Sequence, residues 1–130
     1  MDDKTKFTVE FPIHASPKLL YQYISSPSSL SEWFADNVDL QGNFYSFFWD
    51  GAEERAKLLT KKKDELIRFS WEEDDDIDTS YFFEIKIQVD DLTKDVSLVI
   101  TDFAEDDEVE ESKMFWDNQI SRLKTILGSA

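Results

Sequence analysis

Cysteine is absent from this 130-residue chain, glycine occurs only three times and histidine only once. Without cysteine the chain can form no disulfide framework, no thiol nucleophile and no zinc knuckle. The three glycines lie far apart, so no glycine-rich loop can cradle a phosphate. The single histidine, His14, has no serine or cysteine motif that would complete a catalytic triad. We therefore predict no catalytic residue and no cofactor, and expect a protein that is not an enzyme.

Long apolar runs and an excess of positive charge are also missing. No segment reaches the roughly 18 consecutive apolar residues of a membrane-spanning helix, and the first residues lack the apolar stretch of a signal peptide. The 29 Asp and Glu residues against 14 Lys and Arg residues give a net charge of −15, which repels phosphate backbones and anionic membrane surfaces. We therefore expect a cytoplasmic protein that binds no nucleic acid and forms no stable membrane association.

The charged residues are unevenly distributed along the chain. Basic residues gather between Arg55 and Arg68, whereas residues 72–78 and 105–111 are almost purely acidic. The basic segment is either the solvated edge of a sheet or a surface for one acidic partner.

One acidic run is similar to a calcium-binding loop. Asp74, Asp76 and Asp78 stand at the first three ligand positions of an EF-hand. Thr79 replaces the required glycine, and Ile85 replaces the bidentate glutamate. We therefore predict a solvated turn and no metal site.

Hydrophobic residues, by contrast, make up 41% of the chain, and aromatic residues make up 15%. A chain of this length and composition can build one packed core, so we expect a single domain over residues 1–130. Residues 6–13 alternate apolar and polar side chains, which predicts a half-buried strand at the start of that domain.

Two short helices are expected after this strand. Ser16 followed by Pro17 is typical of a helix start, and apolar residues follow at helical spacing. Pro27 ends this helix, and Ser29 with Glu32 matches a capping box, so a second short helix is predicted directly afterwards.

From Gly42 onward the pattern changes to strands. Asp50-Gly51 is a favoured two-residue hairpin turn between strands at residues 43–49 and 52–60. Further alternating segments lie at residues 65–71, 81–89 and 95–103. Consecutive strands without helices between them favour an antiparallel meander.

The last segment is predicted to be a helix that lies across this sheet. Asp107 and Glu110 can form its capping box. One apolar stripe then runs along it, formed by Trp116, Ile120, Leu123 and Leu127.

This order of elements resembles the helix-grip fold of the START-like (SRPBCC) superfamily. The segments IHASPKLLYQYISSPSSLSEWFA, LIRFSW and DFAEDDEVEESKMFWDNQISRLKTIL are similar to those of the C-terminal domain family of the activator of the heat-shock-protein ATPase. The resemblance implies an α+β fold with an antiparallel six-stranded curved sheet, two short helices after strand 1 and a long C-terminal helix packed across the sheet. The family often has a histidine near the end of its last strand; Thr101-Asp102 stands there instead, so no role of that histidine is carried over.

In this fold the space between the sheet and the last helix commonly forms a cavity for an apolar ligand. The resemblance, together with strand and helix positions that point inward, implies a ligand-binding set: Trp33, Phe34, Trp49, Phe69, Trp71, Phe83, Phe103 and Trp116. Aromatic rings can line such a pocket or fill it completely, and both alternatives stay open. Trp33 and Phe34 are either a gate at its mouth or anchors that hold a short helix on the core.

Two acidic residues within apolar strands can be considered for acid–base chemistry, which needs a carboxyl group with a shifted pKa. Glu84 shares its strand face with Lys86 and is expected to face solvent. Asp102 shares its face with Leu98 and Ile100 and is harder to place. We predict no catalytic role for either residue.

Two functions are compatible with these features. The first is non-catalytic binding of a small hydrophobic ligand, a lipid or a polyketide-like compound, between the sheet and the C-terminal helix. The second is a protein-interaction module, similar to a co-chaperone, with a filled core and a protein partner. An enzyme of the cyclase or hydrolase kind would rest on fold analogy alone. We expect a monomer or a weak homodimer, because the net charge opposes close self-association.

Overall fold

The computed structural model describes residues 4–73 and 75–128 of the chain. The helices are α1 (Pro17–Ser25), α2 (Pro27–Trp33) and α3 (Val109–Leu127), with a short 3-10 helix η1 (Asp106–Glu108) before α3. The strands are β1 (Thr5–Pro12), β2 (Asn37–Gln41), β3 (Phe44–Trp49), β4 (Ala52–Lys62), β5 (Leu66–Glu73), β6 (Asp76–Ile77), β7 (Phe83–Val89) and β8 (Val96–Ala104).

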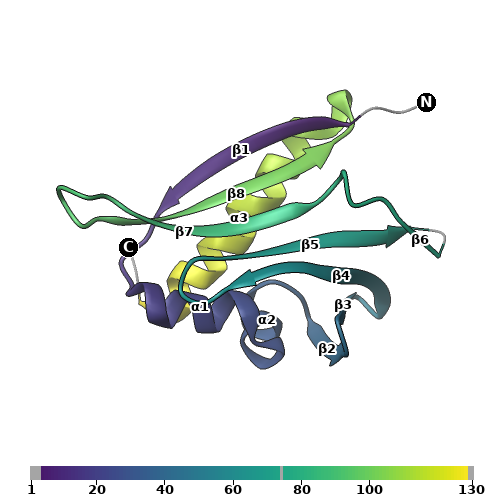
Figure 1. Cartoon of the computed structure of the whole chain (residues 1–130), viewed down its shortest axis with the longest axis horizontal. Helices are drawn as coiled ribbons and strands as arrows, with labels where there is room; N and C mark the ends of the chain where they lie inside the picture. Colours follow the sequence, from purple (N-terminus) through teal and green to yellow (C-terminus); the bar gives the residue numbers. More distant parts are fainter. Residues whose placement is uncertain (1–3, 74, 129–130) are drawn as a thin grey trace.

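All strands belong to one antiparallel sheet with the spatial order β1-β8-β7-β5-β4-β3-β2, and β6 pairs with β5 alone. The sheet curves over α3, which lies behind it in Figure 1, and α1 and α2 lie along one side. The predicted α+β helix-grip architecture is therefore confirmed. Within the described residues the sheet has eight strands instead of six. Neither β2, which buries only Val38, nor the two-residue β6 has an alternating pattern that predicts a strand.

The hairpin turn between β3 and β4 is confirmed where the sequence predicted it. Asp50 and Gly51 both have positive φ angles, 50° and 82°. A type I′ turn requires this conformation at both central residues. Trp49 pairs with Ala52 across the turn, so the turn sets the register of the hairpin.

The start of α1 is confirmed, whereas the start predicted for α2 is wrong. Ser16 caps α1, because its side-chain oxygen accepts a hydrogen bond from the backbone N–H of Leu19 at 3.2 Å. Helix α2 begins at Pro27, and its N-cap residue Ser26 makes no side-chain capping bond. Proline already has the φ angle of a first helical residue, so the helix starts there and not at the predicted capping box around Ser29.

Helix α3 follows the predicted apolar stripe but not the predicted start. It begins at Val109 after η1, and its N-cap residue Glu108 makes no side-chain capping bond, so the expected capping box does not form. Trp116, Ile120 and Leu123 are buried, as the stripe predicted.

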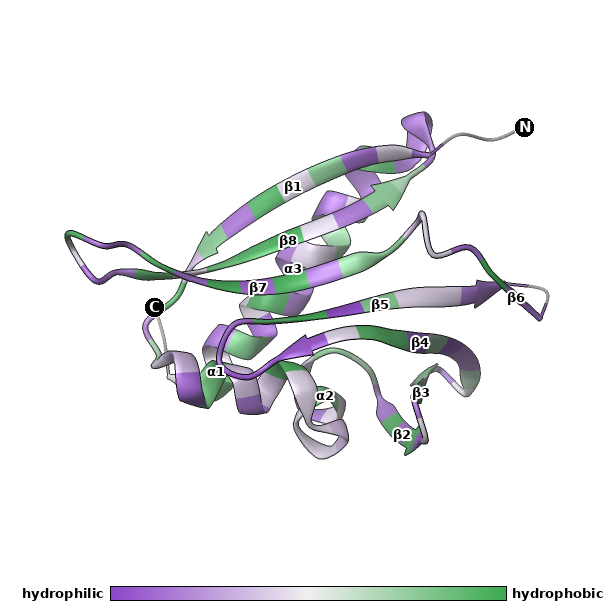
Figure 2. Cartoon of the chain, viewed as in Figure 1, coloured by the Kyte–Doolittle hydropathy of each residue, from purple (hydrophilic) through white to green (hydrophobic). Residues whose placement is uncertain are grey.

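The hydrophobic core lies between the inner face of the sheet and α3. Hydrophobic and hydrophilic residues alternate along β1 and β8 in Figure 2. Phe7 on β1 and Leu98 and Ile100 on β8 are buried on the inner face. This alternation decides which side chain of each strand can reach the interior.

Candidate functional site

The interior contains a continuous cluster of aromatic rings from the sheet, from the end of α2 and from α3. Phe34 lies at its centre and is 1% exposed. Its ring centroid is 5.1 Å from that of Phe47, 5.5 Å from that of Trp116 and 5.8 Å from that of Phe83. Aromatic rings at such distances are in direct contact. We call the following residues the aromatic cluster: Trp33, Phe34, Tyr45, Phe47, Trp49, Phe69, Trp71, Phe83 and Trp116.

The cluster continues along the sheet through Phe83. The Phe83 ring stacks on the rings of Phe69 and Trp71, each with a centroid distance of 5.0 Å. Phe69 and Phe83 also face each other in the β5–β7 register. Rings therefore extend without interruption from Phe34 to Trp71, where β5 leaves its pairing with β7.

Seven of the eight residues predicted for ligand binding belong to the aromatic cluster, and Phe103 does not. Phe103 packs against the rings of Tyr81 and Phe82, with centroid distances of 5.4 Å and 5.1 Å. Strand alternation explains this position: Ile100 and Ala104 are buried on the inner face of β8, so Phe103 points to the other face.

Side-chain hydrogen bonds to backbone carbonyls hold the cluster to α1. The indole N–H of Trp33 donates to the carbonyl oxygen of Tyr23 at 2.9 Å. The hydroxyl of Tyr45 donates to the carbonyl oxygen of Ser25 at 2.8 Å, and burial raises the pKa of Tyr45. These bonds fix large rings in single orientations, so Trp33 anchors α2 to the core.

Phe34 is fixed through its backbone as well as its ring. Its carbonyl oxygen accepts a hydrogen bond from Gln119 Nε2 at 2.6 Å and another from the Trp49 indole N–H at 3.0 Å. Gln119 lies on α3 and Trp49 on β3, so the end of α2 is tied to both layers of the fold.

A pocket of about 120 Å³ lies where the sheet divides. Pairing of β5 with β7 ends at Phe69–Phe83, and beyond this point β5 pairs with β6. Residues 78–82 occupy the gap between β5 and β8. We call this the mouth pocket; its walls include Lys4, Trp71, Glu73, Tyr81, Asp102 and Phe103.

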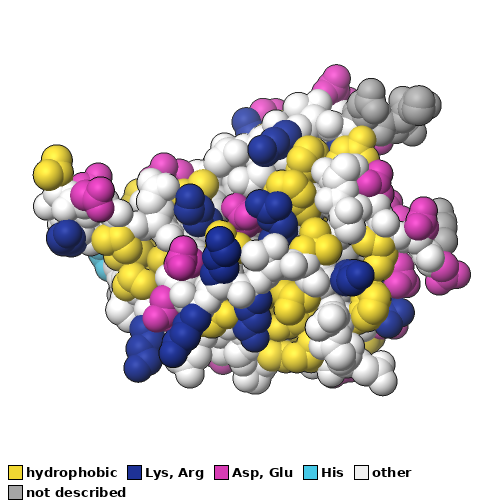
Figure 3. Space-filling model, viewed as in Figure 1, with side chains coloured by type: hydrophobic (Ala, Val, Ile, Leu, Met, Phe, Trp, Pro, Cys, Tyr) yellow, Lys and Arg dark blue, Asp and Glu magenta, His cyan; other side chains and the backbone are white. Residues whose placement is uncertain are grey.

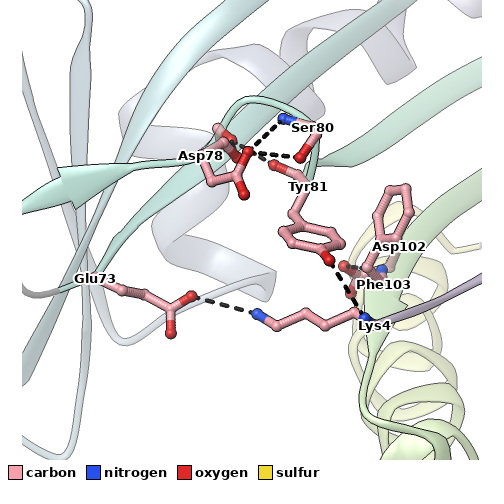
Figure 4. Close-up of polar contacts among 8 residues, drawn as sticks. Lys4, Glu73, Asp78, Ser80, Tyr81, Asp102 and Phe103 are labelled. Atoms are coloured by element: carbon pink, nitrogen blue, oxygen red, sulfur yellow. Dashed lines mark hydrogen bonds and ion pairs between the residues drawn. The ribbon is translucent and has the colours of Figure 1, made fainter. Parts of the chain in front are cut away.

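Figure 4 shows how the polar residues of the mouth pocket are arranged. Lys4 contacts two other residues of the pocket, Tyr81 and Glu73. Its backbone N–H donates to the Tyr81 hydroxyl oxygen at 3.4 Å, and its Nζ lies 3.3 Å from a carboxylate oxygen of Glu73. The turn before β7 positions Tyr81. Asp78 holds that turn by accepting hydrogen bonds from the Ser80 hydroxyl at 2.5 Å and backbone N–H at 3.0 Å, and these bonds lower the pKa of Asp78.

Asp102 connects the mouth pocket to the aromatic cluster. One of its carboxyl oxygens accepts a hydrogen bond from the indole N–H of Trp116 at 2.8 Å, and the other accepts from the backbone N–H of Phe103 at 2.7 Å. Burial raises the pKa of Asp102, although both hydrogen bonds and the charge of Lys4 act to lower it. A carboxyl group in this position can hold a proton or accept a hydrogen bond from a bound compound.

Sequence reasoning identified this site only in part. It singled out Asp102 because of its buried neighbours on β8, and Trp71 because of strand alternation. It placed Tyr81 within a strand, whereas Tyr81 lies in the turn before β7. No sequence signal indicated Lys4, which reaches the pocket because β1 pairs with β8.

The charge of the mouth pocket is mainly negative. Asp76 and Asp78 line it in addition to Glu73 and Asp102, against one cation, Lys4. In the described ranges no group of three or more histidine or acidic residues is close enough to hold a metal ion. Asp74, the first residue of the run that is similar to an EF-hand, lies outside those ranges. None of the described helices is long and apolar enough to cross a membrane.

Comparison with known proteins gives one family match. The model of the START-like superfamily domain matches residues 1–129. No curated protein matches this sequence.

Solved structures show the same fold. The NMR structure of BfR322 from Bacteroides fragilis is 33% identical in sequence, with a TM-score of 0.65; the match covers 98% of this chain and 93% of that one. The structure of the Aha1 dimer from Colwellia psychrerythraea is 17% identical, with a TM-score of 0.73 and coverage of 92% and 93%. XoxI from Bacillus cereus is 17% identical, with a TM-score of 0.74 and coverage of 94% of both chains.

Proposed function

This chain belongs to the START-like superfamily, and we propose that it binds one small apolar compound in the mouth pocket, at the edge of the space between the sheet and α3. The contact between this pocket and the aromatic cluster carries the proposal. Trp71 lines the pocket and stacks on Phe83, and Asp102 lines it and holds Trp116. A compound in the pocket would therefore touch Trp71 and Asp102, which are in direct contact with Phe83 on the sheet and with Trp116 on α3.

The size of the pocket limits the compound. Its volume of about 120 Å³ is below the roughly 300 Å³ at which pockets for drug-sized ligands begin. It is close to the roughly 150 Å³ of an engineered apolar cavity that binds benzene. We therefore propose a ligand that inserts a single ring or a short apolar end. A larger part would stay outside or would require the half-buried side chains of Trp71 and Tyr81 to move.

The charge of the pocket limits the compound further. An anionic ligand would meet the carboxylates of Glu73 and Asp78 in a protein of net charge −15, so like-charge repulsion opposes its binding. This argument favours a neutral, polyketide-like compound over a fatty acid.

Within this proposal the predicted aromatic residues have different roles. Trp71 and Phe103 form walls of the pocket, and Phe83 and Trp116 stand directly behind the walls. The remaining four, Trp33, Phe34, Trp49 and Phe69, support those residues from within the core.

The proposal can be tested by NMR of the tryptophan indole groups. The four tryptophans give four indole N–H signals, which Trp→Phe variants assign. Titration with toluene should shift the signals of Trp71 and Trp116. The signal of Trp33, which donates to Tyr23 in α1, is the internal control and should not move. Benzoate should bind more weakly than toluene. Native mass spectrometry of freshly purified protein would then identify any compound that co-purifies.

An unchanged spectrum with toluene, together with a mass spectrum free of any released compound, would contradict ligand binding. It would favour the second candidate, an interaction module with a filled core. The contacts that surround Phe34 support that alternative, because ring centroids 5.1 to 5.8 Å apart leave no room for a ligand at the centre of the cluster.

A further inference from the structure

The outer face of the sheet is open to solvent and carries much of the positive charge of this acidic chain. Figure 3 shows Lys and Arg side chains gathered over the sheet on the face that points away from α3. Strand register identifies these side chains, because Ile67 and Phe69 of β5 point inward and Leu66 and Arg68 therefore point outward. We call the following residues the basic face: Phe44, Arg55, Lys57, Lys62, Leu66, Arg68, Phe82 and Lys86.

Two arginines of the basic face lie over aromatic rings. The guanidinium carbon of Arg55 is 4.0 Å from the ring centroid of Phe44, and that of Arg68 is 4.0 Å from the ring centroid of Phe82. Arg68 also donates two hydrogen bonds to Glu84, at 2.9 Å and 2.6 Å. Glu84 was expected to face solvent; it lies on the outer face but is only 9% exposed. The stacking holds each guanidinium in one place, and the Arg68 side chain remains 37% exposed. These arginines offer fixed hydrogen-bond donors, although neighbouring acids offset their charge.

The positive charges of three lysines on the same face are not offset by a neighbouring acidic side chain. Lys57, Lys62 and Lys86 form no ion pair with any described residue. Lys62 and Lys86 are both paired with Leu66, from opposite sides of β5. Neighbouring strands are about 4.8 Å apart, so the backbones of the two lysines are about 10 Å apart with an apolar side chain between them. In this row of paired residues, cationic and apolar side chains therefore alternate across the strands.

We propose that the basic face docks a short acidic segment of another protein, one that mixes Asp and Glu with apolar residues. Such a segment would pair with the three lysines and cover Leu66 and the stacked rings. Charge complementarity favours this partner over two others. A nucleic acid would extend beyond the face and meet a protein of net charge −15. A second copy bound by twofold symmetry through this face would set lysines against lysines.

A direct test uses a fluorescein-labelled peptide of about 12 residues, rich in Asp and Glu with two leucines, and measures its anisotropy with the full chain at about 20 mM and about 150 mM salt. The test variant is Lys57→Glu/Lys62→Glu/Lys86→Glu. The control variant, Lys18→Glu/Lys94→Glu/Arg122→Glu, changes the net charge by the same amount at positions on α1, the β7–β8 turn and α3. We expect the test variant to lose affinity by about tenfold or more, and the control by less than about threefold.

The outcomes separate the alternatives. Equal losses in both variants, no binding of the peptide by the unmodified chain at low salt, or tighter binding of an oligothymidylate of the same length would each overturn the proposal. If the charge-reversal variant fails to fold by circular dichroism, the milder Lys57→Gln/Lys62→Gln/Lys86→Gln variant replaces it, with the same direction of change expected. The basic face shares only Phe82 with the mouth pocket, and none of the three lysines lines that pocket, so toluene should leave peptide binding largely unchanged.

Discussion

A carboxyl group buried against an indole is the most informative single residue of this molecule. Asp102 occupies a position of β8 whose neighbours on the same face, Leu98 and Ile100, are fully buried. It is tolerated there because both carboxyl oxygens accept hydrogen bonds, one of them from Trp116 on α3. The residue therefore fixes the indole of Trp116, which stands behind the wall that Asp102 forms in the mouth pocket.

Replacing Asp102 with asparagine should make stability less dependent on pH. Burial raises the pKa of Asp102 in the folded chain, so just above the ordinary carboxyl pKa the folded state holds a proton that the unfolded chain has released. This contribution to stability is complete below a pH of about 3.9 and is lost as the pH rises through the raised value. Asp102→Asn keeps an acceptor for Trp116, and urea unfolding should show it gaining stability relative to the unmodified chain as the pH rises from about 4 to about 7. Asp39→Asn, an exposed change of the same charge, is the control; parallel pH curves for Asp102→Asn and the unmodified chain would contradict the prediction.

The two faces of β8 show where residue-level prediction succeeded and failed. Alternation from Leu98 and Ile100 places Asp102 inside and Phe103 outside, and the structure follows it. Phe103 was nevertheless grouped with the residues whose strand positions point inward, although it is one position out of step with Leu98 and Ile100. Strand geometry determines the direction of a side chain before its chemistry does, so the half-buried Asp102 points to the inner face and the half-buried Phe103 to the outer face.

At the scale of secondary-structure elements, sequence signals were reliable where a single residue or a single turn determines how the element starts or ends. Asp50-Gly51 set the β3–β4 hairpin, and Ser16 capped α1, because both depend on backbone conformation within a few residues. The predicted start of α2 was wrong because two start signals, Pro27 and the capping box around Ser29, lie within one helical turn, and the helix begins at the first of them. Strands β2 and β6 were missed because their pairing partners, and not their own sequences, define them.

The two serine motifs give a matched test of these helix starts. Ser16→Ala removes the 3.2 Å hydrogen bond to the N–H of Leu19 and should lower the free energy of unfolding by about 1 kcal/mol. Ser29→Ala lies within α2 and removes no capping bond, so it should change stability by less than about 0.5 kcal/mol. Urea denaturation of both variants checks the difference, and equal effects would show that the α2 capping box forms in solution.

For the molecule as a whole, the sequence predicted the order of layers but not how they pack. The amphipathic stripes of β1, β8 and α3 require a sheet over a helix, which the fold confirms. Whether Phe34 lines a cavity or fills it depends on distances to rings that are remote in sequence, such as Phe83 and Trp116. No local pattern encodes those distances, and the small pocket formed only because β5 separates from β7.

The net charge of −15 should make stability rise with ionic strength. Carboxylates crowd on one compact surface, so salt screens more repulsion than attraction. Raising sodium chloride from about 20 mM to about 500 mM at neutral pH should raise the melting temperature by a few degrees. The same series near the sequence pI of about 4.3, at low protein concentration, should show a much smaller rise. A melting temperature that falls with salt at neutral pH would mean that ion pairs such as Arg68–Glu84 dominate instead.

The position of β1 in the sheet also determines when this strand can pair during synthesis of the chain. Strands β2, β3, β4 and β5 each pair with a strand next to them in the chain, so this part of the sheet can assemble hairpin by hairpin as the chain is synthesised. Strand β1 leaves the ribosome first but pairs only with β8, at the opposite edge of the sheet from β2. Closing so long a loop is slow because its entropic cost precedes any gain from contacts. Strand β1, with the apolar side chains of Phe7, Val9 and Phe11, therefore stays unpaired through most of synthesis. It finds its partner only when β8 has been made.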